Sequence, residues 1–312
     1  MEKEVEMLLR KQHYGIVGEN GAVKLCTWLK KSLHDKGFCY KQKFYGIQSH
    51  RCLQMTPVAN LCNHNCLFCW RAMDYSRSRV RKFDPPELIV EESIREQQRL
   101  LTGFKGDPTA NQEKVKEAFE PKHAAISLLG EPTLYPYLKE LIEGYHKRGM
   151  TTFVVTNGTK PEVIRKIKPT QLYVTLPAPN ERIYVELTRP LIPNGWEKLN
   201  ETLELMPKIR TRKVMRLTLV KKFNMVEPER YAELLEVAEP HFVEAKAYMA
   251  VGFSVQRLGY DYMPTHEEIL EFSRRIEENS DYKIIDEKRE SRVVLLAKKD
   301  YEWRNLNKAQ PF

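Results

Sequence analysis

The sequence predicts an α/β fold, a partial (βα)6 barrel preceded by an N-terminal extension, and three observations support this prediction. Strand-like and helix-like segments alternate after about residue 50. Polar, glycine-containing turns follow several of the predicted strands. All six cysteines lie within the first 69 residues, so the start of the chain differs chemically from the rest. Strand–helix alternation at this spacing implies parallel strands joined by right-handed crossovers.

The predicted elements follow the hydrophobic pattern of the chain. Six short strands rich in β-branched and aromatic residues are expected at 54–61, 123–129, 152–156, 171–176, 214–220 and 242–249. Six helices are expected at 86–101, 135–148, 161–167, 196–206, 228–236 and 265–278. Pro86, Pro161 and Pro228 fall near helix starts, where a missing N–H removes no hydrogen bond. An added terminal strand is expected at 292–298.

This pattern divides the chain into three parts: an extension (1–53), a barrel (54–300) and a tail (301–312). The composition, with 42% apolar residues, allows a substantial core, and no apolar run is long enough to span a membrane. The N-terminal stretch MEKEVEMLLRKQ lacks the apolar centre of a secretion signal, so we expect a cytoplasmic, reducing location. The net charge of +9 indicates at least a basic surface and makes a polyanion a fair partner.

Three cysteines form a C-x3-C-x2-C loop, at Cys62, Cys66 and Cys69. This spacing suits three corners of a cubic iron–sulfur cluster, for which cysteine thiolate is the usual ligand. The fourth iron would have no protein ligand, and an open metal position is typical of catalytic sites. His64 lies inside the loop and is expected to be a loop residue rather than a ligand.

The other three cysteines, Cys26, Cys39 and Cys52, are spaced thirteen residues apart and form a second triad. Two alternatives remain open for the cysteines. Disulfides are disfavoured by a reducing compartment. Structural zinc usually takes four ligands in two pairs, which this spacing does not provide.

Polar motifs follow the predicted strands at their carboxyl ends, which form the active face of such barrels. Gly130-Glu131-Pro132 follows the second strand, Thr156-Asn157-Gly158-Thr159 the third, and Gly252-Phe253-Ser254 the sixth. Each motif alone is compatible with an ordinary turn. Their convergence on one face predicts an enzyme site.

These residues resemble a known superfamily. Cys62, Cys66 and Cys69, with Phe68 before the last cysteine, resemble the signature of radical S-adenosylmethionine (SAM) enzymes, and Gly130-Glu131-Pro132 resembles the motif that binds the SAM amino group. A narrower resemblance, to the tRNA 4-demethylwyosine synthases of wybutosine biosynthesis in their archaeal single-domain form, rests on 39–57, 62–71, 127–142, 154–159 and 187–199. The second triad matches an extra three-cysteine set of that family. Pro177 departs from the family pattern, where an Asp is expected.

The resemblance implies a radical SAM barrel with two [4Fe-4S] clusters and SAM as cofactors, the second cluster being held by the extension. It implies that 1-methylguanosine at position 37 of tRNA(Phe) becomes 4-demethylwyosine, with pyruvate as the two-carbon donor. The residues expected to bind SAM are Phe68, Gly130, Glu131, Thr156, Asn157, Thr175 and Arg216. For Arg216, a barrel-lining role beside a structural acid is an equal alternative. A flavodoxin-like domain is absent, so an external ferredoxin- or flavodoxin-like electron donor is expected.

A lysine amine can activate a carbonyl through a Schiff base, and Lys41 or Lys43 is the candidate for pyruvate. The alternative for both is a solvated basic loop, and the open iron of the second cluster could also bind pyruvate. RNA contacts are expected from Arg77, Arg79 and Arg81. A second basic group is a weaker candidate for RNA contacts: Lys208, Arg210, Arg212 and Lys213. Aromatic candidates for base stacking are Trp70, Tyr248, Phe253, Tyr260 and Tyr262, of which Tyr248 fits a core position better.

Two rival functions remain open from the sequence. One is another radical SAM enzyme, such as an activase or a peptide-modifying enzyme, in which the second triad holds a cluster that only relays electrons. The other is a non-catalytic RNA-binding module stapled by zinc.

Overall fold

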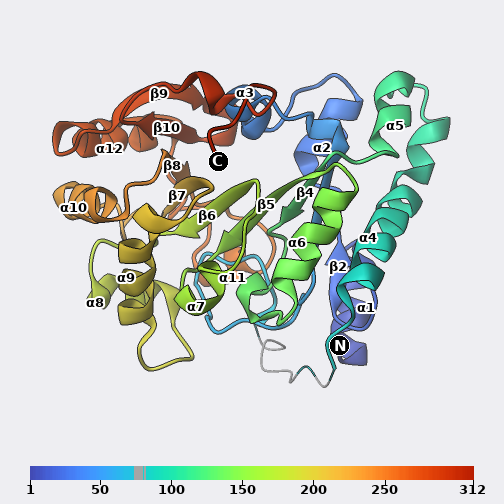
Figure 1. The fold of residues 1–312 in the computed structure, drawn as a ribbon, viewed down its shortest axis with the longest axis horizontal. Coiled ribbons are helices and arrows are strands. Elements are labelled where there is room, and N and C mark those ends of the chain that lie inside the picture. Colours follow the sequence, from blue (N-terminus) through green and yellow to red (C-terminus); the bar gives the residue numbers. More distant parts are fainter. Residues whose placement is uncertain (74–79, 81) are drawn as a thin grey trace. The chain divides into compact units, whose positions relative to one another are not determined.

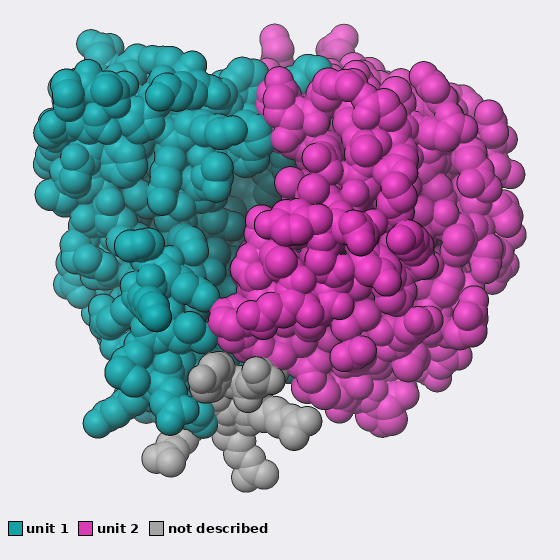
Figure 2. Space-filling view, turned by 180° about the vertical axis from the view of Figure 1, so that it is seen from behind, with its two compact units in different colours: residues 1–62, 75–155, 167–170 teal, residues 63–74, 156–166, 171–312 magenta. Residues whose placement is uncertain are grey.

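The computed structural model describes residues 1–73, 80 and 82–312. The chain divides into two compact units, coloured separately in Figure 2. The first unit comprises 1–62, 75–155 and 167–170, and the second comprises 63–74, 156–166 and 171–312. The three-part division expected from the sequence stays a prediction.

The first unit contains β1 (Gly15–Val17), β2 (Gly21–Val23), β3 (Cys52–Thr56), β4 (His123–Ile126) and β5 (Thr151–Thr156). β1, β2 and β3 pair antiparallel, whereas β3, β4 and β5 pair parallel. Its helices are α1 (Lys3–Lys11), α2 (Thr27–Leu33), α3 (Tyr40–Tyr45), α4 (Pro86–Leu101), α5 (Gln112–Ala118) and α6 (Leu138–Lys147), with α4 and α6 side by side (Figure 1). The 3-10 turns η1 (Ser49–Arg51), η3 (Thr102–Gly106) and η4 (Pro132–Leu134) complete it.

The second unit contains β6 (Gln171–Thr175), β7 (Arg212–Leu219), β8 (Phe242–Ala247), β9 (Lys283–Lys288) and β10 (Val293–Ala297). β6, β7 and β8 are parallel, and β10 pairs antiparallel with both β8 and β9. Its helices are α7 (Pro161–Ile164), α8 (Glu181–Thr188), α9 (Gly195–Leu205), α10 (Pro228–Ala238), α11 (Ser254–Arg257) and α12 (His266–Glu278), with 3-10 turns η5 (Met206–Lys208), η6 (Arg289–Ser291) and η7 (Glu302–Arg304). α12 packs on β8 and β10 and against α10 (Figure 1).

The predicted alternation of strands and helices is confirmed. α4, α7 and α10 each begin at the proline that marked their start. The predicted terminal strand is β10. No described helix of the chain is both long enough and apolar enough to cross a bilayer.

The prediction of a first strand at 54–61 is wrong at its end. β3 stops at Thr56, whose hydroxyl donates to the carbonyl of Leu129 at 2.6 Å and accepts from the N–H of Val58 at 3.2 Å. Pro57, which has no N–H to add to a strand ladder, follows at once. The chain therefore turns toward the cysteine loop five residues earlier than its apolar pattern indicates.

Candidate functional site

The turn that follows β4 fixes the residues that lead into the cysteine loop. Gly130 has a φ of +68°, and a Cβ atom there would lie 1.9 Å from the carbonyl oxygen of Val58. Only glycine allows this backbone conformation at so close an approach. The N–H of Glu131 donates to the carbonyl oxygen of Leu61 at 2.8 Å. The Gly130-Glu131 turn is therefore packed against the residues just before Cys62.

The side chain of Glu131 is buried, with 3% of its surface exposed. Its Oε1 atom accepts hydrogen bonds from the N–H of Thr133 at 3.1 Å and from the Thr133 hydroxyl at 2.6 Å. The carboxylate thus caps η4 and is oriented by its own turn. Its expected role toward the SAM ammonium stays a prediction.

The cysteine loop, 62–69, passes from the first unit to the second after its first residue, and its later part lies along the end of α8. The N–H of Asn65 donates to the carbonyl oxygen of Thr188 at 3.1 Å, and the N–H of Leu67 to that of Leu187 at 2.9 Å. These bonds fix the backbone around the second cysteine of the loop.

His64 anchors the loop inside the second unit. It is 1% exposed; its Nδ1 atom lies 3.0 Å from Asn63 Oδ1 and 2.7 Å from Asn157 Nδ2, and its Nε2 atom lies 2.6 Å from the Tyr184 hydroxyl. Burial, reinforced by the charge of Arg71, lowers the pKa of His64 to about 4. Both ring nitrogens serve the packing of the loop, in agreement with the prediction that His64 is a loop residue.

The turn after β5 belongs to the same network. Asn157 Oδ1 accepts hydrogen bonds from the N–H of Thr159 at 3.1 Å and from its hydroxyl at 2.7 Å. The Thr159 hydroxyl also accepts from Asn63 Nδ2 at 2.7 Å, and the Thr156 hydroxyl accepts from the N–H of Gly158 at 3.1 Å. The structure therefore gives Asn157 a part in anchoring the loop and Thr156 a part in shaping the turn, and their contacts to SAM stay predictions.

Phe68, expected to cover adenine, packs on an apolar cluster of the second unit formed by Leu67, Leu187, Val220, Tyr248, Ala250 and Leu258. Tyr248 is 1% exposed and thus a core residue rather than a stacking platform. Tyr260 and Trp70 are exposed.

The surroundings of Cys66 and Cys69 fit an anionic iron–sulfur cluster. The guanidinium of Arg257, in α11, donates to the backbone carbonyl oxygen of Cys69. The buried guanidinium of Arg71 has two nitrogens, Nε and NH1, without a hydrogen-bond partner in the described ranges. Positive charge within electrostatic reach of the Cys66 and Cys69 sulfurs, and unpaired N–H groups of an arginine bound to the same loop, suit a negatively charged group.

The second triad lies entirely in the first unit, and each of its cysteines stands at the start of a helix or strand. Cys26 is the N-cap residue of α2, where its sulfur accepts from the N–H of Leu29 at 3.3 Å. Cys39 is the N-cap residue of α3, and Cys52 opens β3. Burial raises the pKa of Cys26 to about 11, with a further contribution from Cys39, while Lys41 opposes the shift. Burial raises the pKa of Cys52 as well.

No disulfide is assigned to any of the six cysteines, all of which lie in the described part of the chain. Among residues 1–73, 80 and 82–312, no three His, Cys, Asp or Glu side chains converge as ligands of one metal ion. A cubic cluster differs from a single ion because each cysteine binds a different iron.

Lys41 and Lys43, two residues apart in α3, have different surroundings. Lys41 is 8% exposed, and its Nζ atom lies 4.9 Å from the centroid of the Phe153 ring on β5. The sulfurs of Cys26 and Cys52 both lie within electrostatic reach of Lys41. Lys43 is exposed. The structure thus places the buried Lys41 within electrostatic reach of two sulfurs of the second triad, whereas Lys43 is exposed.

Arg216 on β7 forms an ion pair with Glu244 on β8, with 3.5 Å between NH2 and Oε2. Glu244 is completely buried, and the Arg216 guanidinium lies over the ring of Tyr173. In the β6–β7 register, Thr175 stands opposite Arg216. The arrangement matches the alternative of a barrel-lining arginine paired to an acid, and a contact to SAM stays a prediction for both residues.

The arginines expected to bind RNA, Arg77, Arg79 and Arg81, lie outside the described residues. In the second basic group, Arg212 and Lys213 are buried. Arg212 donates to the carbonyl oxygen of Arg304 at 2.8 Å, and Lys213 to that of Met206 at 2.9 Å. These two side chains hold the fold together and are not available to a polyanion.

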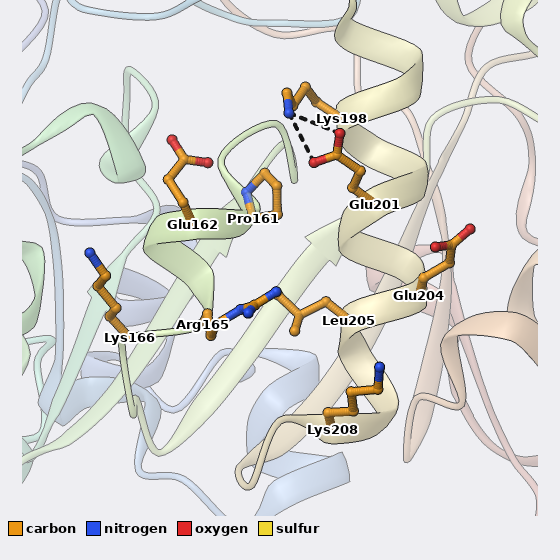
Figure 3. Close-up of a pocket in the computed structure, with 9 residues that line it drawn as sticks. All are labelled: Pro161, Glu162, Arg165, Lys166, Lys198, Glu201, Glu204, Leu205 and Lys208. Atoms are coloured by element: carbon orange, nitrogen blue, oxygen red, sulfur yellow. Dashed lines mark hydrogen bonds and ion pairs between the residues drawn. The ribbon is translucent and has the colours of Figure 1, made fainter.

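A pocket of about 600 Å³ lies between α7 and α9 (Figure 3). Its lining residues are Pro161, Glu162, Arg165, Lys166, Lys198, Glu201, Glu204, Leu205 and Lys208. Lys198 and Glu201, three residues apart on α9, form an ion pair at 2.9 Å. None of the residues expected to take part in catalysis or cofactor binding lines this pocket, whose charged residues are of both signs.

Sequence reasoning missed Tyr184, Arg71 and Arg257. Arg71 follows the last cysteine by two residues, a position that could have drawn attention to it. Arg257 carries no local signal, because its contact with Leu67 spans 190 residues of sequence.

Two family models match the chain. Residues 56–235 match the Radical SAM superfamily, and residues 237–298 match Wyosine base formation. The S-adenosyl-L-methionine-dependent tRNA 4-demethylwyosine synthase of Pyrococcus abyssi is 55% identical over 310 residues, covering 97% of this chain and 91% of that protein. The enzyme of the same name from Methanocaldococcus jannaschii is 44% identical, covering 94% of this chain and 96% of that protein.

Solved structures agree with these relatives. The structure of TYW1 with a lysine-pyruvate adduct bound has a TM-score of 0.89 and 43% identity, covering 96% of both chains. The crystal structure of archaeal TYW1 has a TM-score of 0.80 and 40% identity, again over 96% of both chains.

Proposed function

The chain belongs to the S-adenosyl-L-methionine-dependent tRNA 4-demethylwyosine synthases, radical SAM enzymes with a [4Fe-4S] cluster, and from this premise we propose its substrates and site. We propose that it converts 1-methylguanosine at position 37 of tRNA(Phe) to 4-demethylwyosine and takes two carbons from pyruvate. The observation that carries this proposal is the buried Lys41 beside the sulfurs of the second triad.

Lys41 would hold pyruvate. Its amine attacks the ketone carbon, a C–N bond forms, and the ketone oxygen leaves as water to give an imine. The attacking amine must be neutral, and a buried environment disfavours the charged form of an amine. Support comes from the related TYW1 structure, which has a lysine-pyruvate adduct bound.

The two cysteine triads would hold two [4Fe-4S] clusters. Cys62, Cys66 and Cys69 would hold the cluster that, when SAM is bound, supplies the electron for its cleavage to a 5′-deoxyadenosyl radical. Cys26, Cys39 and Cys52 would hold the second cluster beside Lys41. SAM itself would lie against Phe68, Gly130, Glu131, Thr156, Asn157, Thr175 and Arg216.

The remaining partners follow from the charge of the chain and from its chemistry. A net charge of +9 favours a polyanion such as tRNA, and Arg77, Arg79 and Arg81 would contact its phosphates. The electrons that reduce a cluster would come from a ferredoxin- or flavodoxin-like protein. A cytoplasmic location would keep the thiols reduced.

The test is anaerobic reconstitution with iron and sulfide, followed by incubation with tRNA(Phe), SAM, a reductant and carbon-13-labelled pyruvate. With pyruvate labelled at both carbons that the product retains, mass analysis of the nucleosides should show the tricyclic base carrying two labelled carbons. With pyruvate labelled at one of those two carbons, the base should carry one. Two controls use tRNA(Phe) without the 1-methyl group and reactions without pyruvate, and neither should give product. SAM cleavage without any modified base from methylated tRNA would reject the proposed substrates.

A further inference from the structure

Arg257 at the end of α11 holds the backbone of the cysteine loop in the second unit. Its Nε atom donates to the carbonyl oxygen of Leu67 at 3.2 Å, and its NH2 atom donates to that of Cys69 and, at 3.4 Å, to that of Arg71. Burial lowers the pKa of Arg257, and the thiols of Cys69 and Cys66 act against this shift. One guanidinium therefore binds the loop on both sides of its last cysteine and lies within electrostatic reach of two sulfurs.

Arg71 is a second buried guanidinium at the same loop. It is 5% exposed, and its NH2 atom donates to the carbonyl oxygen of His64 at 2.8 Å. Its Nε and NH1 atoms have no hydrogen-bond partner in the part of the chain that the structure describes. A buried charged donor that forms no hydrogen bond costs free energy of folding. These N–H groups therefore need an acceptor that the described residues do not provide.

Both guanidinium groups contact the backbone of the loop that carries Cys66 and Cys69. Neither Arg71 nor Arg257 has a carboxylate ion-pair partner among the described residues. An anion bound at these cysteines would supply a counter-charge to the two guanidinium groups.

We propose that Arg71 and Arg257 form a cationic clamp that positions the cysteine loop and raises the reduction potential of the cluster held there. Each cluster takes up an electron, so its reduced form is more negative, and fixed positive charge in a buried setting stabilises the reduced form. The unpaired N–H groups of Arg71 donate hydrogen bonds, either to the cluster or to the carboxylate of SAM. The inference rests on the proposed ligation by Cys62, Cys66 and Cys69.

The experiment isolates this cluster by using the full chain with Cys26, Cys39 and Cys52 changed to Ala as the parent. Two variants remove the positive charge: Arg71→Gln and Arg257→Gln. Two others, Arg71→Lys and Arg257→Lys, keep the charge but lose the planar set of N–H donors of a guanidinium. Arg212→Gln is the matched control, because Arg212 is another buried guanidinium of the second unit that donates to backbone carbonyls, those of Trp303 and Arg304. We would measure iron content, the rate of iron loss to a chelator, and the midpoint potential of the cluster. The potential is obtained by spectroscopically monitored titration, and each measurement is made with and without SAM.

Both Gln variants should have a more negative midpoint potential and should lose iron several-fold faster than the parent. The Lys variants should keep the parent's potential and still lose iron faster. A shift in Arg71→Gln that is seen without SAM assigns its N–H groups to the cluster, and one seen only with SAM assigns them to the carboxylate. Potentials unchanged in both Gln variants, or an equal shift in Arg212→Gln, would overturn the clamp. A parent that binds no iron would instead reject the proposed ligands, so the two failures are distinguishable.

Discussion

The Nε2 atom of His64 lies 2.6 Å from the hydroxyl oxygen of Tyr184, although 120 residues separate the two in sequence. Both side chains are buried, and the ring of Tyr184 meets that of His64 edge-on with centroids 5.8 Å apart. Tyr184 lies in α8, the helix whose last carbonyls hold the cysteine loop. This pair therefore ties the orientation of the loop to the core of the second unit.

Tyr184→Phe should destabilise the fold by about 1 kcal/mol, because it leaves a buried imidazole nitrogen without its partner. The variant should also lose iron from the loop faster during chelator challenge. Tyr231→Phe is the matched control, since the buried Tyr231 hydroxyl donates to the carbonyl oxygen of Asn224 at 3.1 Å. Equal iron loss in the two variants would show that Tyr184 acts only through global stability.

Gly130→Ala should disrupt the turn that follows β4 and precedes η4. The added Cβ would lie 1.9 Å from the carbonyl oxygen of Val58, in addition to the roughly 1 kcal/mol that a positive φ costs a non-glycine residue. Gly149→Ala separates these effects, because Gly149 has nearly the same φ, +69°, with nothing within 4 Å of its Cβ position. Urea unfolding should show a much larger loss for Gly130→Ala, and SAM binding should be lost only there. Similar losses at both positions would mean that the close approach does not matter.

Much of the fold was predictable because it depends on local patterns. The helices that begin at Pro86, Pro161 and Pro228 and the parallel strands were apparent from composition and spacing. β1 and β2 have three residues each, too few for an alternating pattern to stand out. β9, with the sequence KIIDEK, is half-buried and highly charged, so its pattern does not distinguish it from a loop.

The site was predictable where its chemistry is local in sequence. The spacing of Cys62, Cys66 and Cys69 predicts a cluster loop from eight consecutive residues, and this ligand assignment stays a prediction. The structural role of Arg212 could not be predicted from local sequence, because a run of basic residues usually indicates a solvent-exposed face. Its partners, the carbonyl groups of Trp303 and Arg304, lie about 90 residues further along the chain. Contacts between residues far apart in the chain leave no trace in a single sequence.

Changing one triad at a time should separate the two clusters. With Cys62, Cys66 and Cys69 replaced by Ala, we expect about half of the reconstituted iron and no SAM cleavage, because the remaining triad does not bind SAM. With Cys26, Cys39 and Cys52 replaced, SAM should still give 5′-deoxyadenosine but no tricyclic base. Iron analysis measures the cluster content, and chromatography of the two reactions measures 5′-deoxyadenosine and the tricyclic base. SAM cleavage that survives the first replacement contradicts the assignment of the catalytic cluster.

Stability of the metal-free protein should fall as the pH decreases from about 6.5 to 4, in part through His123. Burial lowers the pKa of His123 from 6.5 to about 4. Between these values the unfolded chain takes up a proton that the folded chain does not, so acid favours unfolding by on the order of 3 kcal/mol when complete. His123→Gln should reduce the difference in unfolding free energy between pH 7 and pH 4, measured by urea titration. An unchanged difference would show that this histidine does not carry the effect.

Borohydride added to the enzyme with pyruvate should trap a covalent adduct on Lys41. Hydride reduces the imine to a stable secondary amine, so the adduct survives digestion and can be mapped by mass spectrometry. Lys41 is buried over the ring of Phe153, whereas Lys43 in the same helix is exposed. Lys43→Ala is therefore the matched control for Lys41→Ala.

Lys41→Ala should abolish both the adduct and tRNA modification and leave SAM binding intact, while Lys43→Ala should retain all three. The reason is positional, because Lys41 is buried within electrostatic reach of Cys26 and Cys52, whereas Lys43 is exposed. An adduct mapped to Lys43, or modification that continues in Lys41→Ala, would reject the role of Lys41. In the second case the open iron of the second cluster would become the ligand to test for pyruvate, by comparing pyruvate binding with and without Cys26, Cys39 and Cys52.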